Sequence, residues 1–185
     1  MKWKNILLVL ALWVVAGACE KKEIPMFTTD DAGIYFQRVT SYIYGSTTEN
    51  YGDSVAYSFV SAQATAKSVV LSATVRTMGK VADYDRPFKV VVDQEGTTAI
   101  EGKHYEVNLD TVVVPAGAST AYVRVRFFRT SDMMEKAIRL ALRLEENEYF
   151  KCYFPEYKNT NAYSATGALI HGDVFAFSLS EMYTE

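Results

Sequence analysis

The sequence predicts an all-β protein built as an antiparallel β-sandwich. Apolar and polar side chains alternate with a period of two in several segments, which is the pattern of strands that bury one face. Turn residues separate these segments at intervals of roughly ten residues, as is typical of sandwiches. The composition agrees, because 13 Tyr and 10 Phe, together with many Val and Thr, suit a pleated, half-buried surface. The 185 residues are enough for one domain of ordinary size.

The N-terminal residues have the features of a secretory signal peptide. Lys2 and Lys4 supply positive charge, and the apolar run that follows at 6–15 is too short to span a bilayer comfortably. Small residues at 16–18 complete the pattern. We therefore expect residues 1–18 to be a signal peptide.

Cys19 follows these small residues directly, an arrangement that resembles the processing site of a bacterial lipoprotein. The resemblance implies a lipid on Cys19 and a short polar tether at 19–31. One acyl chain gives only marginal membrane binding, whereas two or more, as in bacterial lipoproteins, make it stable. We therefore expect a protein that is tethered to a membrane. An uncleaved N-terminal anchor and a signal peptide cut at another position are the alternatives.

Strands are expected before residue 93 wherever side chains alternate. The expected strands cover 34–37, 55–59, 68–76 and 88–92. The last of them is a continuous apolar run, which predicts burial on both faces of the strand. Residues 38–52 are rich in Tyr, Ser, Thr and Gly, and we interpret them as a long connection. Loops of that length are uncommon unless they carry a function.

The clearest pattern lies at 99–129, where the residues predict a strand, a tight turn and a second strand. Pro115 and Gly117 follow a run of valines and supply the fixed and the permissive φ that a chain reversal needs. In the second strand, Val123 and Val125 take one face and the residues between them take the other. We expect the two strands to pair as a central hairpin.

A further strand is predicted at 138–145, where leucines alternate with polar residues. Leu and Ala also favour a helix. A helix, however, would place Ile138, Leu142 and Glu145 together and would bury too little apolar surface. The alternation therefore favours the strand.

The predicted elements place a sandwich domain at 32–149 and a C-terminal tail at 150–185. Within the tail, residues 169–179 are a candidate for the last strand. Ser178 and Glu181 resemble a capping box, which opens a helix.

Several short motifs resemble those of known β-sandwich families. The segment 102–105 (Gly-Lys-His-Tyr), the segment 114–117 and the strands around Val123 and Leu142 are similar to a Calx-beta sandwich, an Ig-like fold, although that family has Gly-x-Asp-Tyr at the first of these positions. Together with the lipoprotein start and the segment 83–86, the chain more closely resembles an uncharacterised family of Bacteroidetes lipoproteins, a domain of unknown function. Members of that family continue further, so the resemblance implies a shortened tail.

That resemblance also implies a function and partners. Such lipoproteins are encoded near outer-membrane TonB-dependent transporters and their SusD-like surface partners, which import glycans or peptides. We therefore expect a non-catalytic binding or accessory module for nutrient capture, held on the outer membrane and facing the periplasm or the cell surface. The alternatives are a structural adhesin or surface-assembly subunit that uses exposed sheet edges, and an unrecognised hydrolase.

Tyrosines give the strongest hint of a binding site. Tyr42, Tyr44 and Tyr51 lie in the polar segment 38–52, where a core cannot account for all of them. Exposed Tyr offers rigid contact area at a low entropy cost, and its flat ring can stack on a sugar. We expect these three residues to contact a glycan or peptide ligand. Packing of the rings against the edge of the sandwich is the alternative.

Arginines predict a second contact surface. Arg124 and Arg126 alternate on one strand and Arg139 and Arg143 on another, so all four project from one outer face if these strands pair. Such a ladder is either a docking face for an acidic partner or a solvated face balanced by Glu145 and similar residues.

The sequence contains no catalytic or metal-binding constellation. His104 and His171 lie on different segments without ligand-spaced partners, which argues against zinc. Four acidic residues near strand ends are candidates for Ca²⁺, which needs six to eight oxygens, but the acidic run that such sites use is replaced at 130–135. These acidic residues are Asp83, Asp85, Asp93 and Glu95. We expect no metal, no cofactor and, without a G-x-S-x-G elbow or a phosphate loop, no enzyme activity.

Two further observations concern partners. The net charge of -3 gives no general attraction to nucleic acid. Cys152 lies among aromatic residues and has no His-bearing motif beside it, so we expect a buried, inert thiol.

Overall fold

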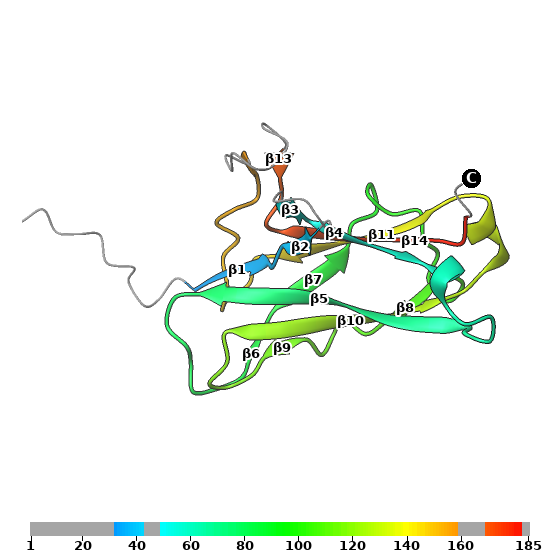
Figure 1. Ribbon diagram of the computed structural model, residues 1–185. Helices are drawn as coiled ribbons and strands as arrows, with labels where there is room; N and C mark the ends of the chain where they lie inside the picture. The colour runs from blue at the N-terminus through cyan, green and yellow to red at the C-terminus, as the bar shows by residue number, and fades with distance from the viewer. Residues whose placement is uncertain (1–31, 43–48, 159–168, 183–185) are drawn as a thin grey trace, which may run out of the picture.

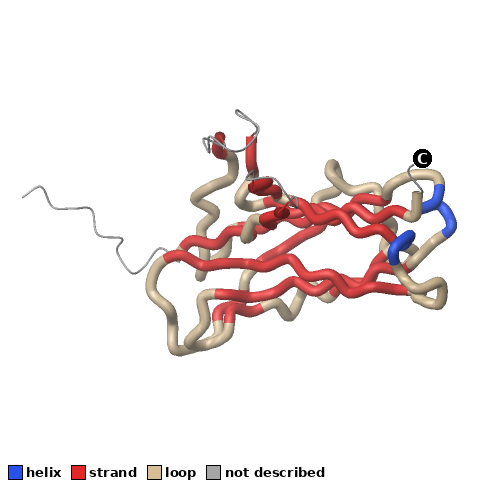
Figure 2. The backbone as a smooth tube through the Cα atoms, in the orientation of Figure 1, coloured by secondary structure: helices blue, strands red, loops and turns tan. Residues whose placement is uncertain are grey.

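The computed structural model describes residues 32–42, 49–158 and 169–182, and this part of the chain is all-β (Figure 1). Its helical segments are two short 3₁₀ turns, η1 (Phe59–Ser61) and η2 (Ser131–Met134), which Figure 2 shows at one end of the molecule. The predicted β-sandwich fold class is confirmed. The predicted signal peptide, lipidated Cys19 and tether lie outside the described residues.

The first sheet has the strand order β1-β5-β10-β8 and is antiparallel. Its strands are β1 (Gly33–Phe36), β5 (Ser68–Met78), β10 (Thr120–Phe128) and β8 (Tyr105–Val107). β5 pairs with β10 along the whole of β10. Val123 lies opposite Ala73 and Val125 opposite Leu71, so the alternation in the sequence gives both strands one apolar face.

The second sheet has the strand order β4-β14-β11-β7. Its strands are β4 (Ser54–Ser58), β14 (Val174–Ser180), β11 (Ile138–Glu145) and β7 (Lys89–Val92). β4 is parallel to β14, whereas the other pairs are antiparallel. β14 lies in the interior of this sheet, so the sandwich extends past the predicted boundary at residue 149. The strand prediction for 138–145 is confirmed by β11.

Three two-stranded ladders complete the described fold. They pair β2 (Val39–Tyr42) with β3 (Glu49–Gly52), β6 (Arg86–Pro87) with β9 (Val113–Val114), and β12 (Tyr157–Lys158) with β13 (Leu169–Ile170). The first of them corrects the prediction of a long connection at 38–52, because both ends of that segment are strands.

The core lies between the two four-stranded sheets. Aromatic rings join across it: the ring centroids of Phe127 and Phe177 are 5.2 Å apart, and those of Phe36 and Phe175 are 5.6 Å apart. Each pair takes one ring from each sheet, and all four rings are buried. Fully burying such side chains stabilises the fold by about 1.5–3 kcal/mol each, so these contacts fix how the sheets stack.

The predicted central hairpin is wrong, because β9 pairs with β6 and not with β10. The turn after β9 is held by hydrogen bonds to residues far away in the sequence. The backbone N–H of Ala116 donates to the Asp85 carboxylate and that of Gly117 to the Ala82 carbonyl, each at 2.8 Å. The turn residues were identified correctly, but the strand before the turn, β9, finds its partner in the 82–87 segment.

The prediction that 88–92 is buried on both faces is also wrong. β7 is the last strand in its sheet order, and its first residue, Lys89, is exposed and pairs with Glu145 at 2.5 Å. A continuous apolar run does not distinguish an interior strand from an edge strand that carries one polar residue.

Candidate ligand-binding site

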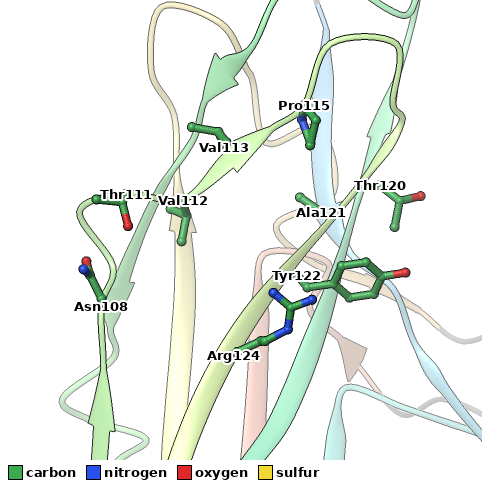
Figure 3. Close-up of a pocket in the computed structure, with 9 residues that line it drawn as sticks. All are labelled: Asn108, Thr111, Val112, Val113, Pro115, Thr120, Ala121, Tyr122 and Arg124. Atoms are coloured by element: carbon green, nitrogen blue, oxygen red, sulfur yellow. The ribbon is translucent and has the colours of Figure 1, made fainter.

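A groove with a volume of about 450 Å³ lies beside the first half of β10 (Figure 3). Asn108 and Thr111 lie on one side of it, and Tyr122 and Arg124 lie on the other. Val113, from β9, forms its upper wall in this view. The groove therefore combines an aromatic ring, a cation, an amide and hydroxyl groups.

The path of the chain after β8 creates this groove. β8 pairs with β10 at residues 125–127 alone, and the chain then leaves the sheet towards β9. On that side, residues 120–124 of β10 have no strand partner in the part of the chain that the structure describes. The sheet consequently has an open edge at the groove.

Strand alternation places backbone polar groups at this edge. On the β8 side the N–H of Phe128 donates to the His104 carbonyl at 2.9 Å, and on the β5 side the N–H of Thr77 donates to the Ser119 carbonyl. Even-numbered residues of β10 therefore direct their backbone groups towards β8, and odd-numbered residues direct theirs towards β5. The backbone of Tyr122 consequently faces the groove.

Tyr122 is the main apolar surface of this site. Its side chain is 52% exposed, and the guanidinium carbon of Arg124 lies 5.6 Å from its ring centroid. A cation near the ring face orients a Tyr side chain that would otherwise move freely. A partly fixed, exposed ring with a cation beside it is a surface that flat ligands such as sugar rings contact well.

The three tyrosines predicted as ligand contacts are not placed at this groove. Tyr44 lies outside the described residues. Tyr42 and Tyr51 lie on the backbone of β2 and β3, opposite Glu49 and Thr40, and their side chains lie outside what the structure describes. Their role as ligand contacts stays a prediction.

The four predicted arginines do not form one face, because their strands lie in different sheets. Arg124 and Arg126 belong to β10 in the first sheet, and Arg139 and Arg143 belong to β11 in the second. The prediction assumed that these strands pair, but β10 has β5 and β8 as neighbours whereas β11 has β14 and β7.

The two arginines of β11 are also engaged within the protein. Arg143 makes ion pairs with Asp93 at 2.7 Å and Asp173 at 3.4 Å, and Arg139 donates to the Gly96 carbonyl at 3.1 Å. A docking role therefore remains a prediction for the β10 arginines alone.

His104 is buried, and its ring is hydrogen-bonded within the protein. It is 2% exposed, and its Nδ1 accepts a hydrogen bond from the Ile100 N–H at 2.8 Å. Its Nε2 lies 3.0 Å from Asp132, so the tautomer with the proton on Nε2 satisfies both contacts. Lys103 also contacts Asp132 at 2.6 Å, and these contacts, with that of Lys103 the strongest, hold the pKa of the Asp132 carboxyl well below its usual range.

Cys152 is half-buried, as a single free thiol among the described residues. Burial raises the pKa of its thiol to about 11, with smaller contributions from Asp173 and Glu146. A thiol with so high a pKa is almost entirely protonated at neutral pH and is a poor nucleophile. The thiol is less buried than the sequence predicts, and its inert role stays a prediction.

The acidic residues near the strand ends are dispersed. Asp85 accepts a hydrogen bond from Ala116, whereas Asp93 pairs with Arg143. Within the described ranges, no group of three or more His, Cys, Asp and Glu side chains is arranged to hold a metal ion. Among these same residues, no helix is both long and apolar enough to cross a membrane.

Sequence reasoning missed the groove, although one signal for it was present. The alternation placed Tyr122 and Arg124 on the outer face of a strand, where a large aromatic residue has no packing role. The opposite wall, with Asn108 and Thr111, depends on where β8 ends and the chain departs, and no residue pattern indicates that point.

Comparisons with known proteins identify a family without an assigned role. Residues 30–166 match a family model described as Domain of unknown function (DUF4843). A structural-genomics crystal structure of unknown function from Bacteroides ovatus is similar over 82% of this chain, with 11% sequence identity and a TM-score of 0.43. The match covers 52% of that structure, so the chain spans about half its length. No curated protein matches the chain.

Proposed function

This chain belongs to the DUF4843 family, a domain of unknown function, and we propose that it is a non-catalytic module that captures glycans at the bacterial cell envelope. The groove beside β10 supports this proposal, because the exposed ring of Tyr122 and the side chain of Arg124 lie on one side of it and the side chains of Asn108 and Thr111 lie on the other. Sugar rings have apolar faces and polar edges, and a site that binds them needs an aromatic surface with hydrogen-bonding groups around it.

The cellular part of the proposal rests on the sequence. The features of residues 1–19 support a lipid anchor on Cys19 and a location on the outer membrane, facing the periplasm or the cell surface. A TonB-dependent transporter with a SusD-like subunit is the proposed partner that would receive the captured ligand. In this arrangement the module raises the local ligand concentration and carries out no chemistry.

Affinity electrophoresis tests the binding step. The full chain is run through gels that contain soluble neutral polysaccharides such as starch, xylan and β-glucan, and a retarded band reports binding. We expect retardation in at least one gel, and we expect the Tyr122→Ala variant to bind at least about tenfold more weakly, because aromatic anchors dominate such interfaces. Tyr153→Ala removes a similarly exposed ring, 44% exposed, outside the groove and is the matched control.

Two results would contradict this proposal. One is migration that no polysaccharide alters. The other is retardation that Tyr122→Ala and Tyr153→Ala reduce equally, because a general loss of aromatic surface would then explain it.

A second candidate function follows from the open edge of β10. Residues 120–124 can accept an added strand on the groove side, which is how some sandwich proteins assemble into surface polymers. Under that function the purified chain forms concentration-dependent oligomers, and Arg124→Pro abolishes them by removing an N–H on the open side. Mass photometry that finds monomers at all concentrations excludes this second function and leaves glycan capture.

A further inference from the structure

Arg86 is a buried cation that has no hydrogen-bond acceptor or acidic partner among the residues that the structure describes. Its side chain is 5% exposed, and two of its nitrogens, Nε and Nη2, are enclosed and have no hydrogen-bond partner in the described part of the chain. Its guanidinium carbon lies 4.7 Å above the ring of Phe150. The nearby carboxylate of Asp85 is instead hydrogen-bonded to the Ala116 N–H at 2.8 Å.

Such an arrangement is costly for a folded protein. Removing a charge from water costs several kcal/mol unless an opposite charge and hydrogen bonds replace the lost hydration. The contact with the Phe150 ring offsets part of this cost, but it leaves the donors unused. An unbranched apolar side chain of similar length would cover the same ring without this cost, so the guanidinium at position 86 needs a reason beyond packing.

A pocket of about 360 Å³ gives that reason. It is lined by Lys80, Val81, Ala82, Asp83, Tyr84 and Arg86. The third guanidinium nitrogen of Arg86, Nη1, also makes no contact with a protein acceptor among the described residues, yet it is not one of the enclosed atoms. It is therefore the nitrogen that can reach a ligand in the pocket. The hydrogen bond from the Gly117 N–H to the Ala82 carbonyl, 2.8 Å long, holds the loop that supplies the other lining residues.

The charges that line the pocket favour a monoanion. Lys80 and Arg86 contribute two positive charges and Asp83 one negative charge, which leaves one positive charge. A carboxylate matches this charge and can accept a charge-assisted hydrogen bond from Nη1 of Arg86, whereas the dianionic form of phosphate would be repelled by Asp83.

The mouth of the pocket is aromatic. Tyr84 is 56% exposed, and its ring centroid lies 6.4 Å from that of Tyr149. A ligand whose carboxylate reaches Arg86 can therefore place a flat, partly apolar body against Tyr84. A uronic acid, in which the carboxylate is attached directly to a sugar ring, has both parts.

We propose that the pocket at Arg86 binds the carboxylate of an acidic sugar, a uronic acid, with its ring against Tyr84. The choice of a sugar rests on the proposed glycan-capture function, whereas the choice of a carboxylate rests on Arg86 itself. The site is separate from the groove beside β10, since the two share no lining residue. The two walls are nevertheless close, because β6 carries Arg86 and pairs with β9, which carries Val113.

Isothermal titration calorimetry with sodium glucuronate tests the proposal on the full chain. We expect saturable binding of glucuronate, no binding of glucose and at most weak binding of phosphate. Arg86→Met keeps the apolar stem over Phe150 and removes the charge, so it should weaken glucuronate binding at least about tenfold. Arg126→Met is the matched control, because Arg126 is exposed on β10 and does not line the pocket, and it should bind glucuronate like the unmodified chain.

Further variants keep the test valid if Arg86→Met does not fold. Lys80→Ala and Tyr84→Ala change exposed side chains of the same pocket, and each should weaken glucuronate binding several-fold without affecting folding. Tyr122→Ala should bind glucuronate normally, so a failure of the groove and a failure of this pocket give different results.

Three results would overturn the proposal. The site would be wrong if glucuronate binding were unchanged in all three pocket variants, Arg86→Met, Lys80→Ala and Tyr84→Ala. Phosphate binding as tight as that of glucuronate would remove the assignment to a carboxylate. Binding of N-acetylalanine, a peptide-like carboxylate, without binding of glucuronate would remove the assignment to a sugar.

Discussion

The two ends of the sandwich each place an arginine over a phenylalanine ring, but they treat its charge in opposite ways. At the end that carries η1 and η2, Arg129 lies 5.8 Å from the centroid of Phe59 and forms a two-point ion pair with Glu181 (Figure 2). At the end that carries β6 and β9, Arg86 lies 4.7 Å from the centroid of Phe150 and has no carboxylate partner among the described residues (Figure 1).

The contrast extends to the residues around each arginine. The Arg129 guanidinium also donates to the backbone carbonyls of Gln63, Ala64 and Ala66, at 3.3–3.4 Å. We call this the paired end, since the charge of Arg129 is paired within the protein. We call the other the open end, since among the described residues Arg86 has no hydrogen-bond acceptor there and residues 120–124 of β10 have no strand partner on one side. We therefore expect the paired end to maintain the fold, and the open end is where we propose that ligands bind.

The largest expected effect comes from replacing each arginine by methionine. Arg129→Met leaves Glu181, whose side chain is 12% exposed, without its counter-charge, and it should lower the midpoint of thermal unfolding by about 10 °C. Arg86→Met removes a buried charge that has no acidic partner in the described part of the chain, so the midpoint without ligand should stay the same or rise. Differential scanning calorimetry of the two variants measures both shifts.

Equal shifts of the unfolding midpoint in Arg129→Met and Arg86→Met would contradict the distinction between the two ends. A similar loss of stability in both would mean that the stacked guanidinium itself, and not its ion pair, supports each end. Arg126→Met, at an exposed position on β10, controls for the loss of an arginine in general and should leave the midpoint within about 1–2 °C.

A smaller effect is expected from the second polar cluster at the paired end. His104→Phe keeps a ring of similar size in a buried position but leaves the Ile100 N–H without an acceptor, which should lower the free energy of unfolding by about 2 kcal/mol. Lys103→Ala removes an ammonium whose side chain is 50% exposed, and it should cost less than about 1 kcal/mol. Urea denaturation followed by far-ultraviolet circular dichroism measures the free energy of unfolding of both variants.

A result in which Lys103→Ala is the more damaging of the two would contradict this order. The surface ion pair, rather than the buried imidazole, would then be the contact that connects the 100–105 turn to η2.

The parts of the fold that the sequence predicts are those set by local alternation. β10 and β11 follow directly from residues that alternate within one strand, and the turn at Pro115 and Gly117 follows from the φ values those residues allow. The choice of strand partner is not local. The turn after β9 donates hydrogen bonds to the Ala82 carbonyl and the Asp85 carboxylate, and these acceptors, which hold β9 beside β6, are about thirty positions away along the chain.

The binding features illustrate the same limit. Tyr122 on an outer face is visible in the alternation, but the groove beside it exists because β8 ends after Val107. The burial of Arg86 is not visible at all, since a strand of two residues has no period. The prediction that the four arginines share one face was wrong for a similar reason. Alternation assigns a side chain to a face within its strand, but it does not indicate which sheet the strand joins.

The smallest expected difference between the two ends is in their response to acid. Hydrogen bonds from Arg129 hold the pKa of the Glu181 carboxyl below its ordinary value of 4.5. A carboxyl whose pKa is lowered by folding stabilises the native state above the unfolded-state pKa, and this stabilisation is lost as the pH falls through the lowered value. Unfolding midpoints measured from pH 7 down to about pH 3 should therefore fall less steeply below about pH 4.5 in Glu181→Gln than in the unmodified chain. Arg86→Met should keep the slope of the unmodified chain, because no carboxylate of a described residue is paired with Arg86. A flatter slope in Arg86→Met would reveal a carboxylate that depends on it and would end the distinction between the two ends.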